Sequence, residues 1–483
     1  MTKADQVERE LKLGAWPEFV LPDLNGFVDG AKPGEPERHD LDAVYYDTPD
    51  LKLLRRGATL RFRRGEPPSD LWTAKLPSDA SAQGLARREI SVSGRRDVVP
   101  KQFVDVMRGW ALGRALRPVA RVSTTREAIP LCDDGGRMLA TMDDDTVTVR
   151  RGRRVVARFR ELEVELVGDA PAEILGAIDE ALRSAGAEHV AQIPKLTRAL
   201  GREAALPWDL EVPPLGSKTT MAQAAQSRLR VSVAHLVDLH APLVLDAEDS
   251  AQRARDVVQA VGAKLDLFAA LLEPEQSEPM REELRRLDND LARVAELDAL
   301  LARAPQASDA RKLSARLGDA RARAHATLLR SLRARPYVAL LERLAEIATK
   351  PPLETDAGRR RAAPAAGKFV RPLWRELRHE EEAPARRVAK LEAAVELAAA
   401  VLDEEAQPAL ERVRELRTLI AEHDRLLAMA RRLRAIRRRL DPDESWAAGM
   451  LAGTAAAQAD AIRARFPAVW QNAADKAIWN WAD

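Results

Sequence analysis

The stretch VERELKL, residues 7–13, indicates how the N-terminal part of the chain folds. In a β-strand, successive side chains point to opposite faces of the sheet. Glu8, Glu10 and Lys12 therefore share one face, while the apolar residues of the stretch share the other. The pattern predicts a first strand with one apolar face and one face rich in carboxylates.

Three later stretches repeat this alternation of charged and apolar residues. They are LRFR at 60–63, WTAKL at 72–76 and ELEVEL at 161–166. The solvated face of an ordinary antiparallel sheet is one explanation for the alternation. However, the charge in each stretch has a single sign, and like charges side by side repel. The segregation becomes favourable where carboxylates surround divalent cations and basic groups surround phosphate oxygens, as in a barrel lined with both.

The motifs and their order resemble the CYTH, or triphosphate tunnel metalloenzyme, family. The E-x-E-x-K of residues 8–12 is similar to the family signature, and YYDTP at 45–49 and LLRRGATLRFR at 53–63 follow in the family order. The resemblance covers roughly residues 3–200 and departs from the family pattern at Pro194 and Ala199. It implies an antiparallel β-barrel or tunnel with flanking helices, in a two-domain chain of the α+β class.

The resemblance also implies roles for individual charged residues. The basic residues expected to bind phosphate are Arg61, Arg63, Lys75, Arg88, Arg126, Lys195 and Arg198. The acidic residues expected to hold Mg²⁺ or Mn²⁺ are Glu8, Glu10, Asp143, Glu161, Glu163 and Glu165. Lys12, Glu8 and Glu10 are expected to act in catalysis, by contacting a phosphate or by orienting the attacking water. Which carboxylate binds metal and which orients water stays open at this stage.

A proline-rich stretch, ALPWDLEVPPLGS at 205–217, is predicted to be a linker because it has neither helical nor strand periodicity. It separates a predicted domain at 1–204 from one at 218–483. The second domain has long segments with helical spacing, such as residues 386–402, and is predicted to be an all-α bundle. Residues 350–372 are predicted to break this part into two runs, which would fit a duplicated bundle.

The helical part resembles the CHAD domain, a bundle that binds polyphosphate, chiefly because it follows a CYTH-like domain. The basic signature of that family corresponds to residues 252–262, where Arg255 is kept but the histidine and the paired arginines are absent. A second copy of the signature would fall near 385–396, with basic residues but without its histidine and tyrosine. Polyphosphate binding and a scaffold role therefore both stay open.

The composition excludes several classes of protein. Of 483 residues, 46% are hydrophobic and 31% are charged, which suits a folded chain of several domains. Lys and Arg number 77 against 75 Asp and Glu, so no specific nucleic-acid partner is expected. The single cysteine, Cys132, excludes an internal disulfide and suits a reducing compartment. Without an apolar segment of membrane or signal-peptide type, we expect a cytoplasmic protein with no membrane partner.

These features predict metal-dependent hydrolysis of inorganic triphosphate to diphosphate and phosphate, with inorganic triphosphate or polyphosphate as the partner. Two alternatives stay open. One is hydrolysis or cyclisation of an organic triphosphate, such as thiamine triphosphate or a nucleotide, although no residue of the sequence points to recognition of a base. The other is non-catalytic binding of polyphosphate, which so many glutamates would weaken. The pattern makes no prediction of the oligomeric state.

Overall fold

The computed structural model describes residues 9–25, 31–65, 70–77, 88–189, 195–269, 277–304, 311–350, 355–377 and 385–482. The chain divides into two compact units, Met1–Trp208 and Asp209–Asp483. Residues 205–217 contain no helix or strand. Among the residues that the structure describes, no helix is both long enough and apolar enough to cross a membrane.

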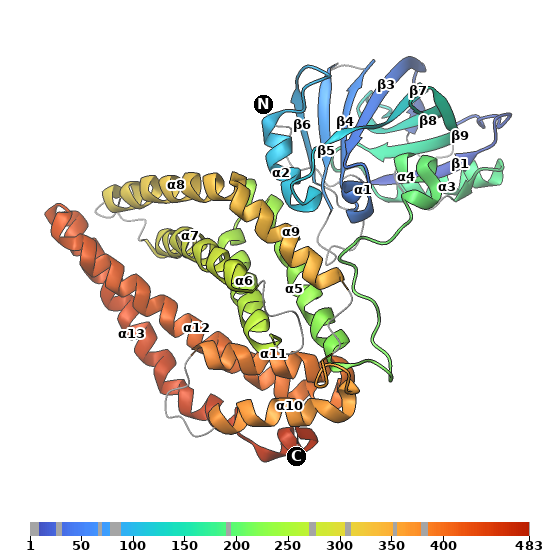
Figure 1. The fold of residues 1–483 in the computed structure, drawn as a ribbon. Helices are drawn as coiled ribbons and strands as arrows, with labels where there is room; N and C mark the ends of the chain where they lie inside the picture. The colour runs from blue at the N-terminus through green and yellow to red at the C-terminus, as the bar shows by residue number, and fades with distance from the viewer. Residues whose placement is uncertain are drawn as a thin grey trace. The chain divides into compact units, whose positions relative to one another are not determined.

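An antiparallel sheet of ten strands forms most of the N-terminal unit (Figure 1). Its strands are β1 (Glu10–Ala15), β2 (Ala31–Pro33), β3 (Glu37–Asp47), β4 (Thr59–Arg64), β5 (Leu71–Lys75), β6 (Glu89–Ser93), β7 (Arg117–Asp133), β8 (Met138–Arg151), β9 (Arg154–Leu166) and β10 (Glu188–His189). Their order is β10-β1-β9-β8-β7-β3-β4-β5-β6, and β2 pairs with β7. Within the described ranges, the edge strands β10 and β6 do not pair, so hydrogen bonds leave the tunnel-like sheet unclosed. The predicted antiparallel sheet with helices is confirmed.

One face of the sheet is apolar and packs against helix α3 (Glu173–Ser184). Leu13, Met142 and Leu162 lie in one buried cluster with Ile178 and Leu182 of α3. These strand residues alternate with the charged residues of the predicted motifs, as the period of two requires. Farther along the sheet, Trp72 is fully buried, and its ring lies 4.8 Å from that of Tyr46 and 5.5 Å from that of Phe62. Burial of this face therefore fixes the charged side chains on the opposite face.

The opposite face has an apolar part of its own, which two short helices cover. These are α1 (Lys52–Arg56) and α4 (Lys195–Leu200). Leu54 of α1 and Leu196 of α4 are buried with Val122, Val147 and other residues of β3, β7 and β8. Val147 lies on the same face of β8 as Asp145, because the two are two positions apart in the strand. Helix α4 thus begins next to the charged part of this face.

Asp47 holds the N-terminal end of α1 in place of an N-cap residue. The helix begins after Leu51, whose backbone is left-handed and whose side chain makes no capping hydrogen bond. The carboxylate of Asp47, only 2% exposed, accepts hydrogen bonds from the backbone N–H groups of Leu53 and Leu54 at 3.0 Å each, and from that of Thr48. The YYDTP motif therefore ties the end of β3 to the first turn of α1.

We expect Asp47→Ala to destabilise the N-terminal unit by about 2 kcal/mol, because it leaves buried N–H groups without acceptors. The measurement is urea unfolding of the full chain, read by pulsed hydrogen exchange on peptides from β3 and β4. Asp134→Ala is the matched control, since the Asp134 side chain is 73% exposed and pairs with Lys32 at the surface. A loss of stability no larger than that of the control would contradict the proposed role of Asp47.

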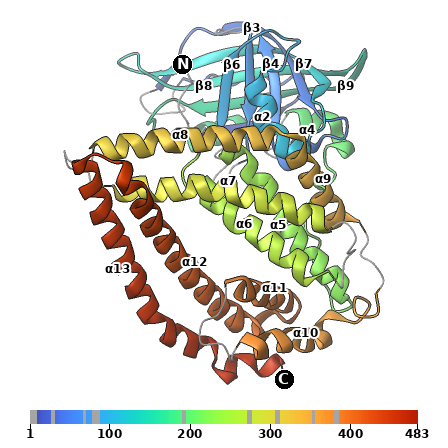
Figure 2. The same cartoon turned by 60° about the vertical axis from the view of Figure 1, so that its left-hand side comes forward.

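The C-terminal unit is a helical domain, as predicted. Its helices are α5 (Met221–Val244), α6 (Ser250–Leu267), α7 (Ser277–Arg303), α8 (Arg311–Arg333), α9 (Arg335–Thr349), α10 (Ala362–Leu377), α11 (Ala385–Leu402), α12 (Gln407–Ile436) and α13 (Pro442–Ala473). Short 3-10 segments lie at Asp403–Glu405, Arg437–Arg439 and Lys476–Ala482. Helices α12 and α13 form a long antiparallel pair, which Figures 1 and 2 show from two directions.

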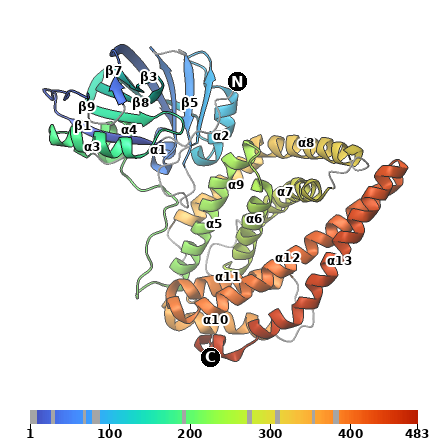
Figure 3. The ribbon, with the colours of Figure 1, turned by 180° about the vertical axis from the view of Figure 1, so that it is seen from behind.

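The predicted break at residues 350–372 is wrong in its second half, because α10 begins at Ala362. Pro364 falls in the first turn, where a backbone N–H has no helical acceptor and its loss costs little. Packing supports the helix farther along, despite Pro372 in its interior. Trp374 of α10 stacks on Trp479 of the C-terminal 3-10 segment, with ring centroids 4.4 Å apart, in the region where Figure 3 shows α10 beside the C-terminus.

Candidate functional site

The strand register brings charged side chains of β1, β9, β8 and β7 into rows on one face of the sheet. One row contains Lys12, Glu163 and Asp143, which are direct neighbours across β1, β9 and β8. The next row contains Glu161, Asp145 and Arg126, across β9, β8 and β7. We call these side chains, together with Glu10, the charged face. Five of the predicted metal or catalytic residues and one predicted phosphate ligand therefore lie side by side.

Three carboxylates of the charged face converge. Ligand oxygens of Asp145, Glu161 and Glu163 all lie within 4.8 Å of one another. Asp145 is fully buried and Glu161 is 4% exposed. Hard divalent cations such as Mg²⁺ prefer carboxylate oxygens, so this donor set suits such an ion. Asp145 was missed from the sequence, although its spacing of two from Asp143 places both on one face.

Three basic side chains contact these carboxylates. Arg126 donates hydrogen bonds from Nε and Nη2 to the two oxygens of Asp145, both at 2.8 Å, and its Nη1 contacts Asp143. The Nζ atom of Lys12 lies 3.0 Å from Glu10 Oε1 and 3.4 Å from Glu163 Oε1. The third is Lys195, whose Nζ lies 3.0 Å from Glu161 Oε1. Acids and bases are therefore interleaved on the charged face.

This interleaving shifts the pKa values in opposite directions. Burial alone would raise the pKa of Glu163, but the charges of Lys195, Lys12 and Arg126 outweigh burial, and the pKa is lowered. Burial lowers the pKa of Lys195, but the neighbouring carboxylates outweigh it, and this pKa is raised. For Glu161, burial dominates over Lys195, so the pKa of Glu161 is raised. Glu163 is thus held in its ionised form more firmly than Glu161.

The lowered pKa of Glu163 predicts how stability depends on pH. In the unfolded chain its carboxyl titrates near the ordinary value of 4.5, whereas in the folded chain it stays ionised to lower pH. Its stabilising contribution is therefore fully present above pH 4.5 and is lost as the pH falls toward the folded-state pKa. We expect the stability difference between the wild type and Glu163→Gln, measured with EDTA by urea unfolding, to shrink below pH 4.5. A difference that stays constant down to pH 3 would contradict this.

The curvature of the sheet brings basic residues of β4 toward these acids. Arg61 faces the same side as Tyr45, its direct neighbour on β3. Burial lowers the pKa of Arg61, but Tyr45, Glu89 and Glu163 raise it, and the net pKa is raised. The charge of Glu163 contributes to the raised pKa of Arg61, although three strands lie between β9 and β4. The two charges are therefore close enough to interact, and the buried Arg61 Nε has no hydrogen-bond partner among the described residues.

The remaining predicted site residues lie apart from the carboxylate cluster. Lys75 pairs with Glu89 of β6 at 3.3 Å, and Arg63 lies opposite Ala43 of β3. The others are Arg88, which is exposed just before β6, and Glu165, which is exposed on β9 opposite Glu10. Glu8 and the side chain of Arg198 lie outside the described residues.

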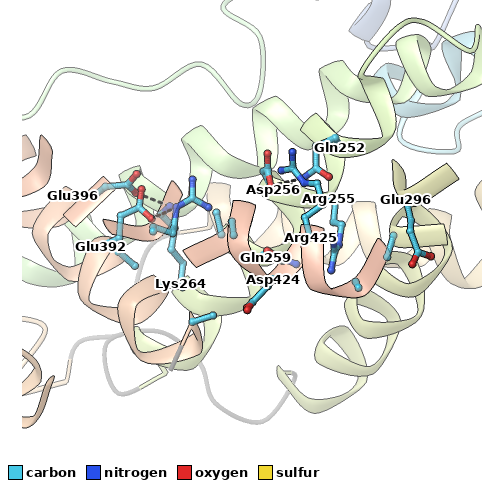
Figure 4. Close-up of a pocket in the computed structure, with 18 of the residues that line it drawn as sticks. Gln252, Arg255, Asp256, Gln259, Lys264, Glu296, Glu392, Glu396, Asp424 and Arg425 are labelled. Atoms are coloured by element: carbon cyan, nitrogen blue, oxygen red, sulfur yellow. Dashed lines mark hydrogen bonds and ion pairs between the residues drawn. The ribbon is translucent and has the colours of Figure 1, made fainter. Parts of the chain in front are cut away.

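A cavity of about 500 Å³ lies between α6, α7, α11 and α12 of the helical unit (Figure 4). Its basic lining residues are Arg255, Lys264, Arg417, Arg425 and Arg431, and its acidic ones are Asp256, Glu296, Glu392, Glu396 and Asp424. Arg255, from the predicted signature, is among them. At one end of the cavity, Lys264 is 4% exposed, and its Nζ lies 2.6 Å from Glu396 Oε2. With equal numbers of each sign, the lining offers no net positive charge to a polyanion.

Comparison with known proteins identifies both units. The family model of the CYTH domain matches residues 9–200, and that of the CHAD domain matches residues 227–434. The chain is a CYTH–CHAD protein. The predicted family is therefore confirmed, and a CYTH domain acts on triphosphates, as a hydrolase or a cyclase, with the help of a metal ion.

Relatives cover either both domains or one of them. The uncharacterized protein MT2285 of Mycobacterium tuberculosis is 30% identical over 369 residues, which are 71% of this chain and 70% of the relative. The solved CHAD domain of Ricinus communis is 16% identical, with a TM-score of 0.40 over 55% of this chain and 97% of its own. PptA from Streptomyces chartreusis is 20% identical, with a TM-score of 0.38 over 52% of this chain and all of its own.

Proposed function

We propose that the CYTH domain hydrolyses inorganic triphosphate to diphosphate and phosphate, with Mg²⁺ or Mn²⁺. The observation that carries the proposal is the convergence of Asp145, Glu161 and Glu163 beside Arg126 and Lys195 on one face of the sheet. A triphosphate carries several negative charges, and phosphoryl transfer depends mainly on positioning and on neutralising this charge. Such interleaved acids and bases can bind a metal ion and a condensed phosphate together.

The carboxylates Asp145, Glu161 and Glu163 would hold the metal, and we propose Glu8, Glu10, Asp143 and Glu165 as further candidates. The ion would supply positive charge against the phosphate oxygens. Arg61 and Arg126 suit the phosphates because a guanidinium can bind two oxygens at once. The buried Nε of Arg61, which has no hydrogen-bond partner within the described ranges, supports this role.

We propose that a water molecule attacks the terminal phosphorus, so that the bond to the bridging oxygen breaks and diphosphate leaves. We propose that Lys12 binds the terminal phosphate or the leaving oxygen, and its contacts with Glu10 and Glu163 support this role. Glu10, on the same face of β1, is the proposed group that orients the water. Lys75, Arg63, Arg88 and Arg198 are proposed to contact the rest of the phosphate chain.

The experiment that tests this proposal is a substrate panel with the full chain. Phosphate release is measured from tripolyphosphate, ATP, thiamine triphosphate and long-chain polyphosphate, with Mg²⁺, Mn²⁺ or EDTA. We expect the highest kcat/KM for tripolyphosphate, and loss of the activity in EDTA. A higher kcat/KM for ATP or thiamine triphosphate would favour the organic alternative, and phosphate release from none of them would favour non-catalytic binding.

For the CHAD domain, we propose a scaffold role in preference to polyphosphate capture. The support is the balanced cavity lining, in which the basic residues face an equal number of carboxylates. Salt-dependent binding of a polyanion needs an excess of basic groups. The proposed bounds are residues 1–204 for the enzyme domain, 205–217 for the linker and 218–483 for the scaffold.

A further inference from the structure

The amino group of Lys195 lies among the carboxylates that suit a metal ion. Its Nζ is 3.0 Å from Glu161 Oε1 and 3.5 Å from Glu163 Oε1, and it also contacts Asp145 Oδ2. These are the same three residues whose oxygens lie within 4.8 Å of one another. The ammonium group and a divalent cation would therefore use the same ligands. Two like charges that share one set of ligands repel each other.

The position of Lys195 on α4 allows its side chain to move while the helix stays in place. The next residue, Leu196, is 2% exposed and is buried with Val147 and Val149 of β8. This contact anchors the start of α4 on the sheet. A lysine side chain has a flexible four-carbon stem, so its amino group can shift by several ångströms without backbone movement.

The other two cations of the charged face are tied to additional acids. Arg126 binds both oxygens of Asp145 and also contacts Asp143, and Lys12 binds Glu10 as well as Glu163. Within the described part of the chain, by contrast, the ion pairs of Lys195 all go to the three clustered carboxylates. Lys195 is therefore the cation that a metal ion at this cluster would displace.

We propose that Lys195 and the divalent cation compete for the cluster of Asp145, Glu161 and Glu163, and that metal binding releases Lys195 toward the phosphates. The first part concerns only metal binding, while the second rests on the proposed function. Lys195 is thus a positioning residue that holds the carboxylates together before metal binds. It lowers the apparent metal affinity, because only the fraction of molecules in which Lys195 has left the cluster can bind metal.

The test is a titration of the full chain with Mn²⁺, followed by the electron paramagnetic resonance signal of free Mn²⁺, without any substrate. Lys195→Met removes the charge but keeps a similar length, and we expect it to tighten Mn²⁺ binding by about tenfold. Lys32→Met is the matched control, because Lys32 is 73% exposed and pairs with Asp134. Its Mn²⁺ affinity should equal that of the wild type. Equal or weaker binding by Lys195→Met overturns the proposal, as does a lack of Mn²⁺ binding by both proteins.

A second measurement uses the wild type and does not depend on the folding of a variant. Lysines are acetylated with a succinimidyl ester with and without Mn²⁺, and the labelled peptides are measured by mass spectrometry. We expect Mn²⁺ to increase the labelling of Lys195 severalfold and to leave that of Lys32 unchanged. Unchanged or reduced labelling of Lys195 overturns the proposal. Neither experiment contains a triphosphate. The competition between Lys195 and metal can therefore be confirmed even if the hydrolysis assay fails, and hydrolysis can be confirmed even if the competition is absent.

Discussion

Glu163→Gln is expected to lower kcat/KM for tripolyphosphate by about 100-fold or more. Changes to groups that merely orient metal ligands cost roughly 10- to 100-fold, so loss of a ligand itself should cost at least the upper value. Glu163 lies at the centre of the charged face, where it contacts Lys12, Arg126 and Lys195. Glutamine keeps the size of the side chain but cannot supply the negative charge.

The matched control for this variant is Glu127→Gln. Glu127 follows Arg126 on β7, so it points to the other side of the strand, and it is exposed. The kcat/KM of Glu127→Gln for tripolyphosphate should remain within about twofold of the wild-type value, because a solvated charge outside the charged face contributes little. Hydrogen exchange on peptides of β8 and β9 establishes that both variants are folded. Wild-type activity in Glu163→Gln would exclude the charged face as the catalytic site.

Lys264→Met is expected to destabilise the CHAD domain by about 3 kcal/mol, because it leaves Glu396 without its closest cation in a buried setting. The Lys264 side chain is 4% exposed, and its Nζ lies 2.6 Å from Glu396 Oε2. Burial raises the pKa of Glu396, but Lys264 and Arg414 outweigh it, and the pKa is lowered. Without Lys264, the ion pair left to Glu396 among the described residues is the one with the half-exposed Arg414, at 3.1 Å.

Urea unfolding of the full chain, followed by pulsed hydrogen exchange on peptides of α6 and α11, measures this effect. Adding Glu396→Gln to Lys264→Met should restore part of the lost stability, because the unpaired charge is then removed. Lys350→Met is the control, since Lys350 and Glu346 form an exposed pair whose loss should cost less than about 1 kcal/mol. A similar small loss for Lys264→Met would show that the pair does not stabilise the bundle.

The alternation of residues in the strands allowed much of the charged face to be predicted. The spacing of two in Glu10 and Lys12, and again in Glu161 and Glu163, places these side chains on one face wherever a strand forms. Asp145 could have been found by the same spacing from Asp143. Residue type and local period are sufficient for such predictions, because the side-chain direction in a strand follows from the backbone.

Distances between strands could not be predicted in this way. Arg61 acts on Glu163 because the sheet curves across three intervening strands, and this curvature depends on the packing of the whole apolar face. Lys195 was predicted as a phosphate ligand, yet its amino group lies among carboxylates. Its place is set by Leu196, which is buried on β8 far away in the sequence.

Local spacing and motif order in the chain are thus enough to show which side chains share a face and which family the chain resembles. Which charges meet depends instead on how the strands and helices pack. Register joined Asp145 to Glu161, and helix packing placed Lys264 beside Glu396. The physical reason is that ion pairing depends on distances of a few ångströms between segments far apart in the chain, and burial of apolar side chains fixes those distances.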